Sequence, residues 1–112
     1  MKKKYYETQI PNKETEKANF CIAIKDDSLI DFNIKKGSYL LVKAQNTIEN
    51  GNLIVFSVDN NILISRVFFY ENNAILTNGY NDKEPLTIKK ESLLKDLKIL
   101  GKVIACQFPI EL

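Results

Sequence analysis

The sequence predicts a mostly β domain, folded as a bent sheet or a partly open barrel with short helical turns. Three observations lead to this class. Apolar residues form short, often alternating runs, the runs recur roughly every ten residues, and turn-forming Asn, Gly and Asp separate them. The chain shows almost no amphipathic helix pattern. At 112 residues, the chain is long enough for one domain with a core of its own.

The chain begins with a segment of different composition. Residues 1–19 carry five Lys and three Glu with few aliphatic residues, and Pro11 interrupts them. We therefore expect a polar N-terminal arm that holds at most one weak strand, followed by the β domain in residues 20–112.

The first half of that domain predicts three strands. Alternating apolar side chains favour a strand over residues 20–25, which an Asp-Asp-Ser step ends before a helical turn at 28–32. A turn at Gly37 precedes the apolar run 39–42. An Asn-Gly step, which suits positive backbone angles, precedes the run 53–58.

The second half predicts a meander that ends in one long strand. Asn-rich turns separate its strands, residues 78–84 form a polar loop, and residues 91–95 suffice for a single helical turn. Gly101 lies inside the last run and predicts a bulge or a bend there. The expected strands are residues 62–70, 74–77, 85–88 at a sheet edge, and 97–108.

Composition excludes several kinds of chemistry. The net charge of +2 offers no strong field for binding nucleic acid, so we expect no direct nucleic-acid contact. The chain has no His and two Cys, which excludes zinc fingers and Ser-His-Asp triads, and we expect neither a metal nor a cofactor. Cys21 and Cys106 lie in apolar runs and are expected to be reduced core residues. The basic start lacks the apolar stretch of a signal peptide, so we expect a cytoplasmic protein without a membrane segment.

An ordered set of motifs resembles a known family. Ser28 ends an Asp-Asp-Ser step after a strand, an Ile-x-x-Gly turn ends at Gly37, and residues 50–55 read Asn-Gly-Asn-Leu-Ile-Val. Ile64-Ser65-Arg66 follows, and residues 99–103 read Ile-x-Gly-x-Val. Over roughly residues 20–108, this order resembles the LexA-like self-cleaving serine peptidases, which include phage repressor C-terminal domains and UmuD. The resemblance implies a bent sheet like that of LexA and signal peptidases.

The resemblance also assigns three site positions. Ser28 occupies the place of the nucleophile, Ser65 stands where the family has its general-base Lys, and Arg66 fills the neighbouring motif position. A buried neutral Lys accepts the nucleophile's proton, whereas a Ser hydroxyl is no base near pH 7. Asp26 replaces the family's Gly and adds a charge beside the expected oxyanion region, and residues 1–27 contain no Gly for a small-residue cleavage bond. The pattern therefore predicts a peptidase that has lost activity, whether Ser65 arose naturally or by engineering.

Three functions remain open from the sequence. The first is a non-enzymatic dimerisation and protein-interaction module in phage-repressor or SOS-type transcription regulation, a homodimer that works with a DNA-binding or regulatory partner. Its pairing surface is expected among residues 68–70 or 103–108. The second is an active Ser-Lys peptidase in which Lys43 or Lys102 reaches Ser28; a signal-peptidase-like enzyme shares that pair but needs a membrane anchor. The third is an unrelated β-barrel domain that binds through its Asn-rich loops.

Overall fold

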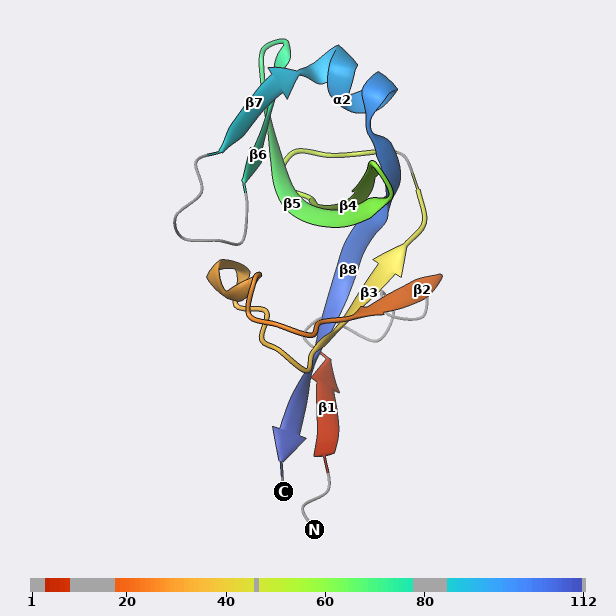
Figure 1. Cartoon of the computed structure of the whole chain (residues 1–112), viewed down its shortest axis with the longest axis vertical. Coiled ribbons are helices and arrows are strands. Elements are labelled where there is room, and N and C mark those ends of the chain that lie inside the picture. Colours follow the sequence, from red (N-terminus) through yellow and green to blue (C-terminus); the bar gives the residue numbers. More distant parts are fainter. Residues whose placement is uncertain (1–3, 9–17, 46, 78–84, 112) are drawn as a thin grey trace.

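The computed structural model describes residues 4–8, 18–45, 47–77 and 85–111 of the chain (Figure 1). These residues are mostly β, as the alternating sequence predicts. The strands are β1 (Lys4–Thr8), β2 (Phe20–Ala23), β3 (Tyr39–Lys43), β4 (Leu53–Val58), β5 (Asn61–Tyr70), β6 (Asn73–Thr77), β7 (Leu86–Lys89) and β8 (Lys98–Glu111). A 3-10 turn, η1 (Ile30–Phe32), and a short helix, α2 (Lys90–Asp96), complete the described elements. The expected loop at 78–84 lies outside the described residues.

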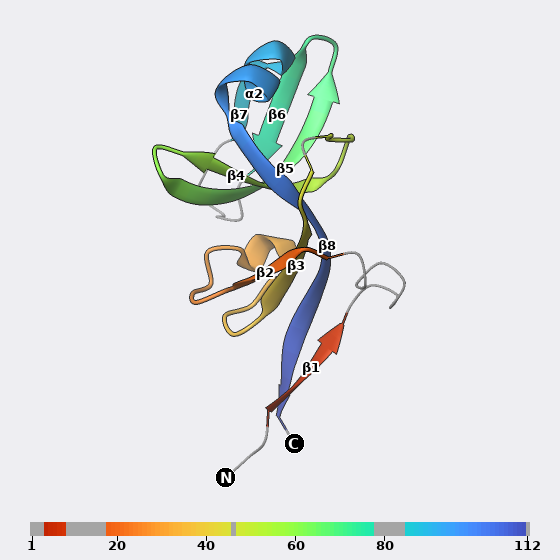
Figure 2. The same cartoon turned by 90° about the vertical axis from the view of Figure 1, so that its right-hand side faces the viewer.

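The strands form one antiparallel sheet in which β8 is the spine. The order is β2-β3-β8-β4-β5-β6-β7, and β1 also pairs with β8, with Thr8 opposite Gln107. The two end strands, β2 and β7, have four residues each and lie in opposite halves of the molecule (Figures 1 and 2). They do not pair, so the sheet is bent but open. The predicted fold class, a mostly β domain with a bent or partly open sheet, is confirmed, and the described strands do not close into a barrel.

Two irregularities in the pairing of β8 lie where the sheet bends. Leu41 faces Ala105 while Val42 faces Val103, so β8 carries one extra residue against β3. Against β4, the register shifts between Gly101 and Ile99. An extra residue on one strand of an antiparallel pair bends that strand and increases its twist. The predicted bulge at Gly101 is confirmed.

The middle of the sheet is covered on both faces, because β4 contributes to two apolar clusters. Leu53 and Val55 belong to the first cluster, with the segment after β2 and with β3. Ile54 and Phe56 belong to the second cluster, with β5, β6 and α2. Since successive side chains of a strand point to opposite faces, one six-residue strand supplies both cores.

The two helical segments lie where the sequence predicts helical turns. The turn expected at 28–32 is η1, whereas the single turn expected at 91–95 is wrong in length, because α2 has seven residues. Leu93 explains the longer helix, since it is fully buried in the second cluster and anchors α2 there. The amine of Lys90 also lies 4.9 Å from the centre of the Phe69 ring.

One core assignment from the sequence was wrong. Cys21 is exposed, because it lies on the edge strand β2, where only Ile22 is partly covered. Cys106 is half-buried against the first cluster. Burial raises the pKa of its thiol, and the neighbouring Ser38 hydroxyl offsets part of that rise. The run over residues 85–88 is the edge strand β7, as expected.

The position of Gly101 makes a testable prediction about stability. A Cβ atom at this residue would overlap the backbone carbonyl of Lys43 and crowd Val42. We expect Gly101→Ala to lower the free energy of unfolding by about 2 kcal/mol, because packed backbone cannot yield. Urea denaturation followed by circular dichroism measures the change.

The matched control is Gly51→Ala. Gly51 has a φ of +86° and nothing within 4 Å of an added Cβ, so this change introduces backbone strain without a clash. We expect it to cost roughly 1 kcal/mol. Equal losses for the two variants would contradict the role given to the close contact at Gly101.

Candidate functional site

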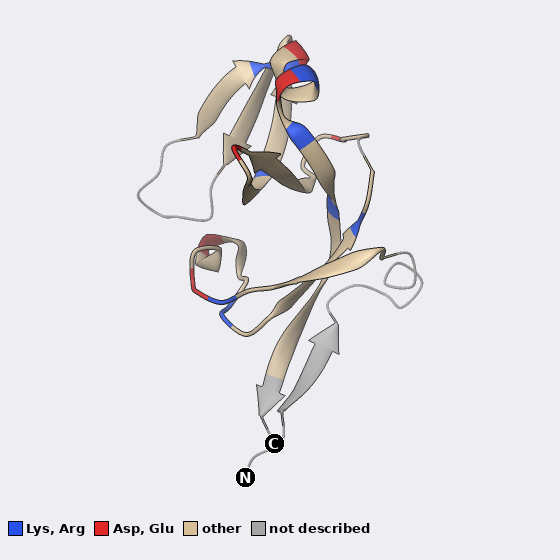
Figure 3. Ribbon diagram, turned by 45° about the vertical axis from the view of Figure 1, so that its right-hand side comes forward, with Lys and Arg blue, Asp and Glu red and all other residues tan. Residues whose placement is uncertain are grey.

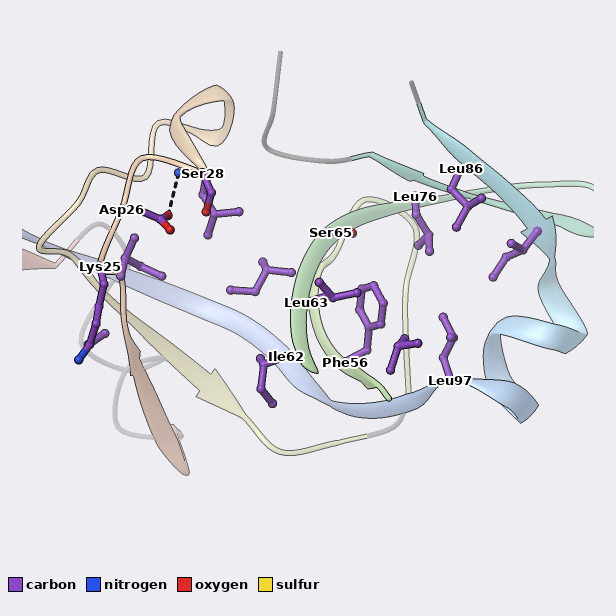
Figure 4. Close-up of a pocket in the computed structure, with 16 residues that line it drawn as sticks. Lys25, Asp26, Ser28, Phe56, Ile62, Leu63, Ser65, Leu76, Leu86 and Leu97 are labelled. Atoms are coloured by element: carbon purple, nitrogen blue, oxygen red, sulfur yellow. Dashed lines mark hydrogen bonds between the residues drawn. The ribbon is translucent and has the colours of Figure 1, made fainter. Parts of the chain in front are cut away.

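A groove of about 620 Å³ lies between the two halves of the sheet (Figure 4). One wall comes from the end of β2 and the segment that follows it, as far as Leu29. The floor comes from the β4–β5 hairpin, and the far wall comes from one residue of β6, two residues of β7 and Leu97, which follows α2. Most lining side chains are apolar, and the polar ones are Lys25, Asp26, Ser28 and Ser65. The groove therefore presents a few polar groups within a hydrophobic channel, as binding sites commonly do.

Ser28 lies at one end of the groove, in a turn that two aspartates organise. Its backbone N–H donates a 3.0 Å hydrogen bond to Oδ1 of Asp26, and the N–H of Lys36 donates a 3.1 Å bond to Oδ1 of Asp27. Hydrogen bonds from the Ser28 side chain and backbone hold the pKa of Asp26 below its usual value. The Asp26 carboxylate is thus a charged acceptor beside Ser28, and its lowered pKa makes it a weak base.

Ser65 lies on β5 in the floor of the same groove. It is 3% exposed and faces Ile54 of β4 across the hairpin. The groove thus contains both serines that the motifs single out, although they are 37 positions apart in sequence. Their chemical roles stay predictions.

One lysine, Lys25, lines the groove among the described residues. Figure 4 shows its side chain pointing away from Ser28 and Ser65. Lys43 and Lys102, the alternative bases, face each other across β3 and β8 and do not line the groove. Basic residues are spread over several elements and mixed with acidic ones (Figure 3).

The third motif residue, Arg66, does not line the groove. Because it follows Ser65 on a strand, its side chain projects to the opposite face of β5. Its Nη1 donates a 2.9 Å hydrogen bond to the carbonyl of Gly51, and its guanidinium carbon lies 5.5 Å from the centre of the Phe32 ring. The structure therefore separates Arg66 from the two serines.

Sequence reasoning missed the apolar part of the groove. Ile62, Leu63 and Leu86 are exposed although they are large and apolar, and all three line the groove. Three consecutive aliphatic residues at 62–64 break the strict alternation of a half-buried strand, and this was the available signal. The wall from β7 left no such signal, because it comes from a distant part of the chain.

The described residues hold neither a cluster of metal-ligand side chains nor a membrane-spanning helix. Among residues 4–8, 18–45, 47–77 and 85–111, no group of three or more His, Cys, Asp or Glu side chains could hold a metal ion. Within those residues no helix has the length and apolar character needed to cross a membrane.

The bent antiparallel sheet with a serine turn at the mouth of an apolar groove defines a peptidase-like β domain. Residues 2–104 match the family described as Peptidase S24-like. The chain belongs to this family. It is 40% identical to the LexA repressor of Caldicellulosiruptor saccharolyticus over 86 residues. These aligned residues make up 76% of this chain and 39% of the relative. It is 34% identical over 101 residues to the LexA repressor of Carboxydothermus hydrogenoformans, covering 88% of this chain and 47% of the relative.

A third relative shows the same partial coverage. The LexA repressor of Magnetococcus marinus is 31% identical over 86 residues, which cover 77% of this chain and 36% of that protein. The chain thus spans less than half the length of these relatives.

The turn at Ser28 makes a prediction about Asp26. Ser28→Ala removes the hydrogen bond that contributes most to the low pKa of Asp26, so this pKa should rise toward its ordinary value of 3.8. The stabilising effect of the turn is present above the unfolded-state pKa and is lost as pH falls through the lower folded-state pKa. Carboxyl-detected NMR titration measures the pKa in both proteins. Ser57→Ala on β4 is the control, and an unchanged Asp26 pKa in Ser28→Ala would contradict the assignment.

Proposed function

We propose that the chain is the LexA-like domain of a cytoplasmic transcription regulator that keeps the peptidase fold and has lost self-cleavage. It acts as a dimerisation and protein-interaction module in phage-repressor or SOS-type regulation. The observation that supports the proposal is the burial of Ser65 in the groove, since the motif resemblance assigns Ser65 to the position of the family's general base. The similarity to LexA repressors supports the regulatory role.

The chemistry of the groove favours loss of cleavage. A serine nucleophile needs a group that takes its proton, and positioned general bases are worth roughly 10² to 10⁴ in rate. The hydroxyl of Ser65 cannot serve near pH 7. The Asp26 carboxylate is negatively charged and adjoins Ser28, so it opposes the negative charge that develops on an attacked carbonyl.

Binding can persist without cleavage because other residues provide it. The exposed apolar side chains of Ile62, Leu63 and Leu86 form much of the groove surface, and none takes part in proton transfer. Burying them against a partner segment would be favourable, since each large aliphatic side chain contributes about 1.5 kcal/mol or more when fully covered.

The proposed homodimer would use the outer face of β5. Phe68 and Tyr70 are 40% and 67% exposed, and Phe68 faces Ile75 of β6 across the sheet. Phe69 points the other way and packs against the second cluster, so it serves the core. At the other expected surface, Ile104 and Ala105 are buried within the protomer, which favours the β5 face.

The proposed loss of cleavage is tested by comparing the unmodified protein with the Ser65→Lys variant, which has a base at this position. We expect the protein to keep its intact mass at alkaline pH, where any lysine base would be most active, and to resist labelling by a fluorophosphonate. Ser65→Lys should make Ser28 reactive toward that reagent by about 10²-fold or more. Mass spectrometry of the labelled peptide measures both results.

Two variants complete the comparison. Ser28→Ala combined with Ser65→Lys should abolish the labelling, and Ser65→Met adds bulk of similar length without a base. Circular dichroism establishes that each variant is folded. Ser28-dependent fragments or labelling of the unmodified protein would favour the alternative, an active peptidase that uses a relocated lysine.

The dimer makes a separate prediction. Phe68→Lys combined with Tyr70→Lys should convert the dimer to a monomer, because charged groups resist burial in an apolar interface. Sedimentation velocity at micromolar concentration measures the change. Leu94→Lys on α2, which alters an exposed leucine elsewhere, should leave the dimer intact. A monomeric unmodified protein at these concentrations would contradict the proposed module.

A further inference from the structure

A second pocket, of about 400 Å³, lies beside η1, the Asn50-Gly51 turn and β8. Its walls are largely apolar and include Phe32, Leu53 and Phe108. Arg66 also lines it and is the sole arginine of the chain. The volume is within the range of pockets that hold small molecules.

The guanidinium of Arg66 is held in place rather than free to swing into solvent. It is partly buried, donates one 2.9 Å hydrogen bond to the carbonyl of Gly51, and lies over the ring of Phe32. The turn that bears this carbonyl is fixed to β5, because Gly51 N–H donates to the carbonyl of Val67 at 2.7 Å and Val67 N–H donates to the carbonyl of Asn52 at 2.9 Å. A fixed guanidinium loses little freedom when it binds a ligand.

The positive charge of Arg66 has no acidic partner among the described residues that line the pocket. These include neither Asp nor Glu, and Arg66 is their one charged side chain. An arginine has five N–H donors in a planar fork that matches a carboxylate. One positive charge within apolar walls is complementary to a single negative charge on an apolar body.

We propose that this pocket binds a small aromatic monocarboxylate, with its carboxylate on Arg66 and its ring against Phe32, Leu53 and Phe108. A dianionic phosphate fits less well, because one guanidinium would leave the second charge unpaired against apolar walls. The site lies apart from Ser28 and Ser65, so this inference stands or falls independently of the proposed loss of cleavage.

Phenylacetate is the probe that tests the site. We expect NMR titration of the full chain to give a dissociation constant below about 1 mM, with shifts at Arg66, Phe108 and the Gly51 turn. Phenylacetamide has the same shape without the charge and should bind at least about tenfold more weakly, because hydrogen bonds to charged partners are the stronger ones. Equal binding of the two compounds, or shifts confined to the Ser28 groove, would overturn the proposal.

Variants at two residues separate the charge from the fold. Arg66→Gln should reduce phenylacetate affinity about tenfold or more, and Arg66→Lys, which keeps the charge without the fork, should give an intermediate loss. Phe108→Glu keeps Arg66 but places a carboxylate in the pocket wall, so it should abolish binding of phenylacetate. Phe108→Leu and Lys98→Gln are the controls for altered packing and for general loss of positive charge.

Proton NMR dispersion establishes that each variant is folded. If Arg66→Gln fails to fold, the comparison of Phe108→Glu with Phe108→Leu decides the question. Unchanged phenylacetate affinity in a folded Phe108→Glu protein would overturn the site.

Discussion

The close contact between β8 and β3 at Gly101 is the constraint on which the rest of the structure depends. β8 passes between β3 and β4, and the backbone of Lys43 comes so near that no side chain fits at residue 101. The register shifts on either side of this point bend the spine of the sheet. Because of that bend, the segment bearing Ser28 and the hairpin bearing Ser65 line one groove.

Successive side chains of a β-strand point to opposite faces, so Ser65 and Arg66, which are neighbours in one motif, lie on different faces of β5. Ser65 is buried in the groove and faces Ile54, whereas Arg66 projects from the other face and faces Leu53. The Arg66 side chain reaches the Gly51 carbonyl and the Phe32 ring, so it connects β5 to the turn before β4 and to η1. A motif that appears continuous in sequence thus contributes to two separate pockets. This separation explains how one pocket could change its chemistry while the other keeps its structure.

Much of the fold was predictable from the sequence because the signals were local. Alternating apolar runs bounded by Asn and Gly turns placed the strands, and Gly101 marked the bulge. Closure of the sheet was not predictable, since it depends on whether the distant end strands β2 and β7 meet. Cys21 was misplaced for the same reason, because an apolar run does not reveal that its strand lies at an edge. Burial of Leu93 lengthened α2 beyond its sequence signal.

The candidate site, like the fold, was predictable only where its sequence signals were local. The motif positions of Ser28 and Ser65 came from a resemblance, and their shared groove required the three-dimensional bend. The apolar residues that form most of the groove come from β2, β4, β5, β6 and β7 and from the segments that follow β2 and α2, so no single stretch of sequence predicts them. Proton transfer would require one residue at one place, whereas the binding surface is distributed over five strands. A single change at residue 65 can therefore remove the chemistry of the groove and leave the surface that would bind a partner.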